Sequence, residues 1–362
     1  MEEQYKDKKI QNNFDEDNSM KCNPKFKGLI EGMLSGSSHD RVVNSFIEMF
    51  EYRDEKRLNA FDRIKSTGRL ALPTLYGILL DDDVLTYVSA KSMNFKRKEI
   101  AEKLKDNDIR EKIENRKVII KMNSLVLISK IVANLDYEEK NKAVSVFQHV
   151  LLTEKNPDVL YSALLSLEKL GDASATLLYS INQLAKDQNQ SLRVRNQAIT
   201  LIAKASEFSK NSVNLLLNIL SNPKEDATVK ANAIISLEEY TDSVSKEQVA
   251  EIFKILAKEL EVSNDTEFIN RCTNLFAALG SKILEHLIPL IRDKTKSLKL
   301  REVACFACFG AVKKDYNLES YILTEFDNAI RELKPDPYPF NVTNDDIRIY
   351  ELLVDLAKKL SY

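Results

Sequence analysis

One helical pattern recurs six times along this chain of 362 residues. Segments starting at residues 120, 159, 194, 229, 269 and 300 each open with an aliphatic residue, place a small residue four positions later and an apolar residue four positions after that. Residues spaced in this way share one face of an α-helix. The starts lie 39, 35, 35, 40 and 31 residues apart, a spacing that indicates one helix pair per repeat.

Composition and length agree with a helical array. Glycine and proline number only eight each, whereas a large sheet protein uses more turn glycines. A single compact core rarely grows beyond roughly 250–300 residues. A chain of 362 residues therefore forms either two domains or an elongated stack of repeats.

The second helices of several repeats resemble those of the HEAT/armadillo-like family. They open with "VRNQA" (194–198), "VKANA" (229–233) and "LREVA" (300–304). The first helices "ALPTLYGILLDDD" (71–83) and "EHLIPLIRDK" (285–294) carry a proline within an apolar run, as many HEAT first helices do. The resemblance covers roughly residues 39–360 and implies an all-α, right-handed α-solenoid. It implies little about function, because such repeats serve many roles.

The pattern predicts a disordered tail over residues 1–25 and a single solenoid domain over 26–362. A charged insertion is expected at about 84–117, and a proline-rich loop at 334–343 precedes a closing helix capped by Thr343 or Asn344. The predicted repeats, about eight in number, span residues 39–67, 70–133, 138–170, 174–205, 210–241, 246–280, 281–313 and 318–360.

A row of mostly basic residues directly follows the aliphatic start of each segment. In chain order it holds Lys121, Leu160, Arg195, Lys230, Asn270 and Arg301. One interpretation is a basic strip that binds an acidic partner segment. The other is a structural ladder, common in HEAT arrays, in which each cation bonds an acidic residue of a turn. The acidic residues near such turns are Asp158, Asp226 and Asp265.

The insertion is the most basic region of the chain. Residues 91–121 hold eleven Lys or Arg against six Asp or Glu. Helical spacing places Phe95, Ile100 and Leu104 on one face. Two roles remain open for the insertion: a docking element for an acidic protein or for phosphates, or a solvated helix over the solenoid. Its candidate binding residues are Phe95, Lys96, Arg97 and Lys98.

The proline-rich loop offers two further candidate binding residues, Tyr338 and Phe340. Aromatic side chains on rigid extended loops can form recognition spots. The alternative is that both side chains fold back and cap the core of the last repeat.

Residues typical of catalysis or metal binding are scarce. The three histidines do not lie at metal-ligand spacing, and no phosphate-binding or nucleophile-elbow motif occurs. HEAT-like enzymes resembling deoxyhypusine hydroxylase bind iron through His-Glu pairs, and this chain has no His-Glu dipeptide. Cys305 and Cys308 form a C-x-x-C spacing, but sibling repeats place aliphatic residues at both positions. We therefore expect buried packing cysteines, no metal and no cofactor.

Charge and hydropathy restrict the classes of function that the chain can have. The net charge of −2 gives no global attraction for nucleic acid. The sequence shows no apolar run long enough to span a bilayer and no signal peptide, so we expect a cytoplasmic protein without membrane insertion. The favoured function is a non-enzymatic scaffold or adaptor that binds a protein or peptide, acidic in character, along a concave solenoid surface. The alternatives are a nucleic-acid-associated HEAT-like protein, which is not favoured, and a divergent HEAT-like enzyme, which is favoured less.

Overall fold

The computed structural model describes residues 37–50, 54–95, 99–170, 177–204, 209–334 and 343–361. All regular secondary structure in these ranges is helical, which confirms the predicted all-α class. The chain divides into two compact units, unit 1 with residues 1–174 and unit 2 with residues 175–362. The predicted tail over 1–25 lies outside the described residues, and the single domain over 26–362 stays a prediction.

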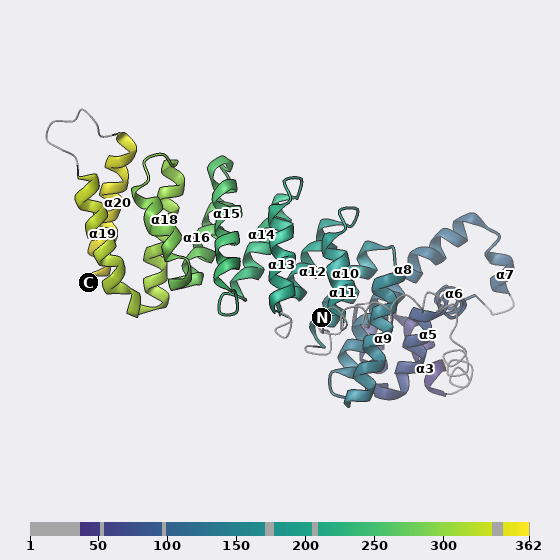
Figure 1. Cartoon of the computed structure of the whole chain (residues 1–362). Helices are drawn as coiled ribbons and strands as arrows, with labels where there is room; N and C mark the ends of the chain where they lie inside the picture. The colour runs from purple at the N-terminus through teal and green to yellow at the C-terminus, as the bar shows by residue number, and fades with distance from the viewer. Residues whose placement is uncertain are drawn as a thin grey trace, which may run out of the picture. The chain divides into compact units, whose positions relative to one another are not determined.

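Unit 1 holds three pairs of packed helices among its described residues: α3 with α4, α5 with α8, and α9 with α10. The short helices α6 and α7 lie between α5 and α8 in the chain (Figure 1). Its elements are α3 (Ser37–Met49), α4 (Asp54–Thr67), η1 (Gly68–Ala71), α5 (Leu72–Leu80), α6 (Asp82–Lys91), α7 (Ile100–Lys103), α8 (Asn107–Val132), α9 (Tyr137–Thr153) and α10 (Pro157–Glu168).

The insertion differs from its predicted bounds. Helix α8 runs without a break from Asn107 to Val132, so the expected boundary at 117 falls inside a helix. Asp81 lies between two helices, as the C-cap residue of α5 and the N-cap residue of α6. Its carboxylate caps the start of α6 by accepting the backbone N–H groups of Asp83 and Val84. The second predicted repeat thus contains four helices, and for this reason the total of eight repeats stays a prediction.

Unit 2 is a succession of five helix pairs among its described residues (Figure 1). In order, α11 packs with α12, α13 with α14, α15 with α16, α17 with α18, and α19 with α20. The bounds are α11 (Leu178–Lys186), α12 (Leu192–Lys204), α13 (Ser209–Ser221), α14 (Ala227–Glu238), α15 (Lys246–Val262), α16 (Thr266–Leu279), η5 (Gly280–Lys282), α17 (Leu284–Arg292), α18 (Leu298–Lys314), η6 (Tyr316–Leu318), α19 (Glu319–Leu333) and α20 (Asn344–Leu360).

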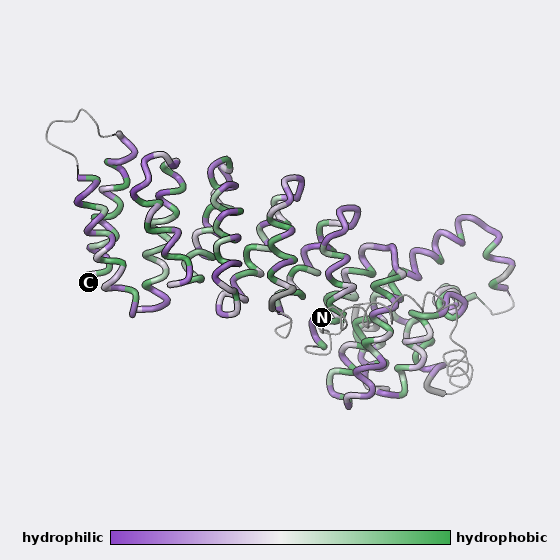
Figure 2. Tube along the Cα trace, in the orientation of Figure 1, coloured by the Kyte–Doolittle hydropathy of each residue, from purple (hydrophilic) through white to green (hydrophobic). Residues whose placement is uncertain are grey.

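The second helices of unit 2 form one continuous stack, because α12 packs on α14, α14 on α16, α16 on α18 and α18 on α20. Hydrophobic positions recur along every helix of this unit, whereas the connecting turns are mostly hydrophilic (Figure 2). A single pair could not bury its apolar stripes alone, so each pair is stabilised by its neighbours. The closest approach joins α16 and α18, where a Cβ placed on Gly310 would lie 2.9 Å from Cβ of Ala277.

Helix caps set the register of the repeats. In each of five second helices, a polar side chain lies three residues before the first buried apolar residue and accepts a backbone N–H of the first turn. These cap and core pairs are Asn156 with Val159, Ser191 with Val194, Asp226 with Val229, Asp265 with Phe268, and Ser297 with Leu300.

The caps correct one predicted segment. The stripe of α16 starts at Phe268 and not at residue 269, because Asp265 caps the helix. The fully buried small residue four positions later is Cys272, whereas the predicted Thr273 is half-buried. In α20, the cap is Thr343, one of the two residues expected, and its hydroxyl accepts the N–H of Asp346.

Candidate functional site

The four cations of the predicted row all form ion pairs within the described chain. We call the residue four positions after the N-cap of a second helix the ladder position, and Lys121 is its counterpart in α8 by the alignment of the repeats. Three of the four cations are buried, with 3%, 7% and 1% exposure for Arg195, Lys230 and Arg301. The pairs, with their donor–acceptor distances, are Lys121 with Glu154 at 2.6 Å, Arg195 with Glu225 at 2.6 Å, Lys230 with Glu259 at 3.1 Å, and Arg301 with Asp346 at 2.8 Å.

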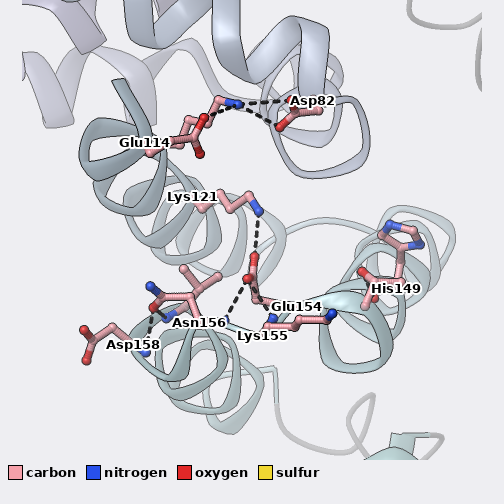
Figure 3. Close-up of polar contacts among 11 residues, drawn as sticks. Asp82, Glu114, Lys121, His149, Glu154, Lys155, Asn156 and Asp158 are labelled. Atoms are coloured by element: carbon pink, nitrogen blue, oxygen red, sulfur yellow. Dashed lines mark hydrogen bonds and ion pairs between the residues drawn. The ribbon is translucent and has the colours of Figure 1, made fainter. Parts of the chain in front are cut away.

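The pair in unit 1 shows how a turn is held (Figure 3). Lys121 donates to Oε2 of Glu154, while Oε1 of the same carboxylate accepts the backbone N–H groups of Lys155 and Asn156 at 2.8 and 2.9 Å. Glu154 therefore links α8 to the turn between α9 and α10. One turn earlier on α8, the nearly buried Lys117 binds both carboxylate oxygens of Asp82, at 3.0 and 3.1 Å, and ties α6 to α8.

The two arginines repeat one arrangement. Nε of Arg195 donates to the carbonyl oxygen of Ala185 at 3.1 Å, and Nε of Arg301 donates to that of Ile291 at 3.1 Å. Each acceptor lies ten residues earlier, at the end of the first helix of the same pair. Since the guanidinium tip reaches a carboxylate of the following pair, each arginine joins both helices of its own pair to that following pair. A fixed donor fork of this kind suits arginine better than lysine.

The carboxyl groups of three of these pairs have lowered pKa values, which favours their charged form. Burial by itself raises the pKa of the Glu154, Glu225 and Asp346 carboxyls, but hydrogen bonds from Lys121, Arg195 and Arg301, together with other local hydrogen bonds, hold each pKa below its ordinary value. The positive charges of the row are therefore neutralised inside the fold. As partner-binding residues these four stay a prediction, and the geometry favours the ladder interpretation.

The acidic partners differ from those the sequence suggested. Asp226 and Asp265 cap their own helices, and Asp158 lies in the first turn of α10, where Asn156 is the cap. The ladder acids come instead from turns, from the last turn of a first helix and from the first turn of α20. No general sequence rule marks them, because they follow their cations by 33, 30, 29 and 45 residues.

Two ladder positions hold no cation. Leu160 is fully buried in α10. In α16 the corrected register places Ile269 at the ladder position, whereas Asn270 is exposed one residue further on. At that step the pairs are held by the close apolar packing of α16 on α18.

Phe95 belongs to a small apolar cluster within the insertion. Its ring packs, partly buried, against Ala90, Ile100 and Ile113, next to Leu104. The three residues expected on one helical face do lie together, but Phe95 precedes α7 and Leu104 follows it. The other predicted residues of this region and of the proline-rich loop, namely Lys96, Arg97, Lys98, Tyr338 and Phe340, lie outside the described residues.

The cysteines of α16 and α18 pack in the core. Cys272, Cys305 and Cys308 are free thiols with no exposed surface. Burial raises the pKa of all three thiols, that of Cys308 to about 12. Thiolates are the reactive form, so these side chains act as small hydrophobic residues.

The histidines lie apart, in three different first helices. His39 is buried, with Nδ1 3.2 Å from the hydroxyl of Thr74, and burial lowers its pKa. Burial also lowers the pKa of His149. His286 stacks on Phe253, with ring centroids 5.0 Å apart. Within the described ranges, no three His, Cys, Asp or Glu side chains lie together as a metal site.

Hydropathy gives no spanning helix in the part of the chain that the structure describes. Only the bent pair Thr266–Lys282 and Leu284–Arg292 reaches the required length and apolarity together, with a bend of 116°.

A periodic surface lies on four second helices of unit 2, namely α12, α14, α16 and α18. The residues two and six positions after the first buried apolar residue share one side of each helix, and none of them is buried. We call this set the second-helix face. It comprises Asn196, Thr200, Ala231, Ile235, Asn270, Asn274, Glu302 and Phe306. Ile235 and Phe306 hold equivalent positions and are 37% and 46% exposed. The set carries a single charge, Glu302, which pairs with Arg348 at 2.7 Å. The repeat spacing in the sequence already places these residues on one side of each helix. Among the residues of the repeats, only the cations were considered from the sequence, so this surface was not predicted.

Within each unit, stacked helix pairs joined by ion pairs between neighbouring pairs define an all-α arrangement of solenoid type. No family model and no curated protein sequence matches the chain.

Among solved structures, the chain is similar to YibA of Escherichia coli at 14% identity and a TM-score of 0.41, over 92% of this chain and 96% of YibA. It is also similar to Kap121p bound to RanGTP at 13% identity and a TM-score of 0.46, over 92% of this chain and 35% of Kap121p. For human deoxyhypusine hydroxylase in complex with glycerol the identity is 11% and the TM-score 0.27, over 92% of this chain and 98% of the other. The fold class rests on the helix packing described above, and these similarities add no function.

Proposed function

We propose that the protein is a non-enzymatic scaffold that binds a protein or peptide partner on the second-helix face of unit 2. The observation that supports this most directly is the exposure of Ile235 and Phe306 at the same repeat position of α14 and α18. Core-facing neighbours on the same helices are fully buried, so these two side chains are exposed by their place in the repeat. Apolar anchors set among polar residues are typical of protein interfaces.

The contribution of Ile235 and Phe306 to partner binding can be estimated from their exposed area. Complete burial of an isoleucine or phenylalanine side chain stabilises by about 1.5–3 kcal/mol. Since Ile235 and Phe306 are less than half exposed, contact with a partner would contribute about 1 kcal/mol from each. Together they account for a change of roughly 30-fold in the dissociation constant.

The test is quantitative affinity purification with two double variants. Ile235→Ser with Phe306→Ser removes both anchors. Val262→Ser with Tyr316→Ser removes two side chains that are each 77% exposed at turns away from the face. We expect the control to retain its partner and the anchor variant to lose it, at equal melting temperatures. Equal recovery by both variants would contradict the proposal.

Other parts of the functional hypothesis stay proposals. A preference for an acidic partner has less support than the sequence suggested, because the ladder cations are paired and the second-helix face carries no cation. The absence of enzymatic activity is also part of the proposal, as is a cytoplasmic location, which the free cysteines support.

Of the alternative functions, nucleic-acid binding has the least support from the structure. Lys121, Arg195, Lys230 and Arg301 would have to leave their carboxylates to reach phosphates. Binding to phosphates weakens steeply with salt. A nucleic-acid complex whose affinity falls with salt, and which survives the loss of Ile235 and Phe306, would favour this alternative over the scaffold.

A further inference from the structure

The last described helix exposes a face that is buried in the helices before it. In α12, α14 and α18, the ladder position and the positions four and seven residues later are buried, and each ladder cation reaches a carboxylate of the next helix pair. These residues are Arg195, Ile199 and Ile202, then Lys230, Ile234 and Leu237, then Arg301, Cys305 and Cys308, and all nine are buried. In α20, no further helix pair follows among the described residues.

The cap fixes which residues of α20 hold these positions. Because Thr343 caps α20 as Ser297 caps α18, Asp346 corresponds to Leu300. The ladder position is then Ile347, followed by Glu351 and Val354. Ile347 and Val354 are half-buried and Glu351 is exposed. Lys358, the counterpart of the buried Val312, is exposed as well. We call Ile347, Glu351, Val354 and Lys358 the end face.

We propose that a second copy of this chain covers the end face with its own α20, packed antiparallel about a two-fold axis near Val354. This inference concerns the oligomeric state and does not depend on the partner proposed for the second-helix face. A symmetric pair of this kind closes on itself and forms a dimer.

Charge complementarity selects a second copy in this orientation. Glu351 and Lys358 lie seven residues apart, so both belong to the same side of the helix, two turns from each other. Val354 lies between them. In the antiparallel arrangement, Glu351 of each copy faces Lys358 of the other, so the contact forms twice. A parallel arrangement would instead place Glu351 against Glu351. Neither side chain forms an ion pair with any described residue.

The rest of α20 agrees with this orientation. An antiparallel neighbour runs in the opposite direction to α20. The helix dipoles then also oppose each other.

The dimensions predict a weak dimer. A helix of 17 residues is about 25 Å long, and one helix-on-helix contact buries less than the roughly 1,200 Å² of a stable interface. We therefore expect a dissociation constant in the micromolar range or weaker, rising with salt because the charged pairs are solvent-accessible.

The first test is sedimentation velocity of the full chain from about 1 μM to about 1 mM, a range that brackets a weak dimer. We expect the wild type to show a reversible monomer–dimer equilibrium. Lys358→Glu places like charges opposite each other at both contacts and should weaken the dimer about tenfold. Lys334→Glu, an exposed lysine at the end of α19, serves as a matched control and should leave it unchanged.

Charge reversal makes the test specific for a second copy. Glu351→Lys alone should also weaken the dimer, and the double variant Glu351→Lys with Lys358→Glu should restore it. A mixture of the two single variants should form a heterodimer more tightly than either variant forms a homodimer. A monomeric wild type over the whole range would overturn the proposal, and would mean that another protein, another segment of the chain or solvent covers the end face. A dimer indifferent to Lys358→Glu, or not restored by the double variant, would overturn it equally.

Discussion

Replacing Arg195 by alanine tests the ladder at a pair in which both side chains are buried. The side chains of Arg195 and Glu225 are 4% and 3% exposed, and both guanidinium nitrogens bond the carboxylate, at 2.7 and 2.6 Å. The variant removes these two bonds and the bond from Nε to the carbonyl of Ala185. Among the described residues, Glu225 then keeps the backbone N–H of Asp226 as a hydrogen-bond donor. The variant thus leaves a buried carboxylate without its cation.

The loss of folding stability expected for Arg195→Ala follows from the burial of this pair. Breaking a buried ion pair by removing one partner costs about 3–5 kcal/mol, because the remaining charge is uncompensated. An exposed pair contributes only about 0.2–1 kcal/mol. Arg348→Ala is the matched control, since Arg348 also joins two helix pairs through a carboxylate, that of Glu302, but is 65% exposed. Arg195→Met with Glu225→Met should recover part of the lost stability, because no buried charge remains.

The assay is urea unfolding followed by circular dichroism, with each variant compared through the change in its free energy of unfolding. We expect Arg195→Ala to lose several times more stability than Arg348→Ala. Equal losses would refute the ladder interpretation. So would an Arg195→Ala, Lys230→Ala double variant that loses its partner without any change in melting temperature.

The same pair predicts an acid response. The pKa of Glu225 is lower in the fold than its ordinary value of 4.5, so the pair stabilises fully above pH 4.5, and this contribution is lost as the pH falls through the lower folded pKa. In Arg195→Ala the pKa of Glu225 should rise. Stability measured against pH should then fall less steeply below 4.5 than in the wild type.

Three further predictions test other parts of the structure. Gly310→Ala should lower the urea midpoint, because the new Cβ would lie 2.9 Å from that of Ala277, although alanine favours helix over glycine by up to about 1 kcal/mol. Adding Ala277→Gly should restore the midpoint, and a midpoint raised by Gly310→Ala alone would contradict the close packing. Cys305 and Cys308 should react with a thiol reagent only after unfolding, since both are buried with raised pKa; rapid labelling of native protein, mapped by mass spectrometry, would revive a redox role. His39 is buried with a pKa below 6.5, so its neutral form stabilises the fold above that pH and the contribution is lost as the pH falls through the lower folded pKa; the amide protection factors of α3, corrected for the pH dependence of intrinsic exchange, should fall below pH 6.5, and His39→Gln should remove that fall.

The fold was predictable because each repeat carries the same local signals. A small residue such as Ala198 or Ala233, framed by aliphatic residues, can be buried only against another helix, and polar caps mark the helix starts. The one error of register arose in α16, where Phe268 and Ile269 are both apolar and periodicity alone does not choose between them. The cap Asp265 does choose, so cap residues deserve equal weight with apolar ones when repeats are aligned.

The candidate site was less predictable because it depends on contacts between repeats. The cations were found at their positions, but Glu225 and Glu259 lie in different settings, a turn and a helix end, so sequence spacing does not mark them. The second-helix face was hidden for another reason. Exposed Ile235 and buried Ile234 are alike in the sequence, and only the packing of neighbouring helices distinguishes them.

Lysine labelling of the native protein tests the central claim most directly. The account holds that the basic row is used inside the molecule, so Lys230 of that row, whose side chain is 8% exposed, should react slowly with an amine reagent. Lys117, one turn before Lys121 on α8 and 10% exposed, is held by an ion pair in the same way and should also react slowly. Exposed Lys358 supplies the reference rate. With modification quantified peptide by peptide, we predict rates at least about tenfold lower for the two paired lysines, because reaction requires the ion pair to open. Labelling of Lys230 and Lys117 as fast as that of Lys358 would show that their charges face solvent and would contradict the account.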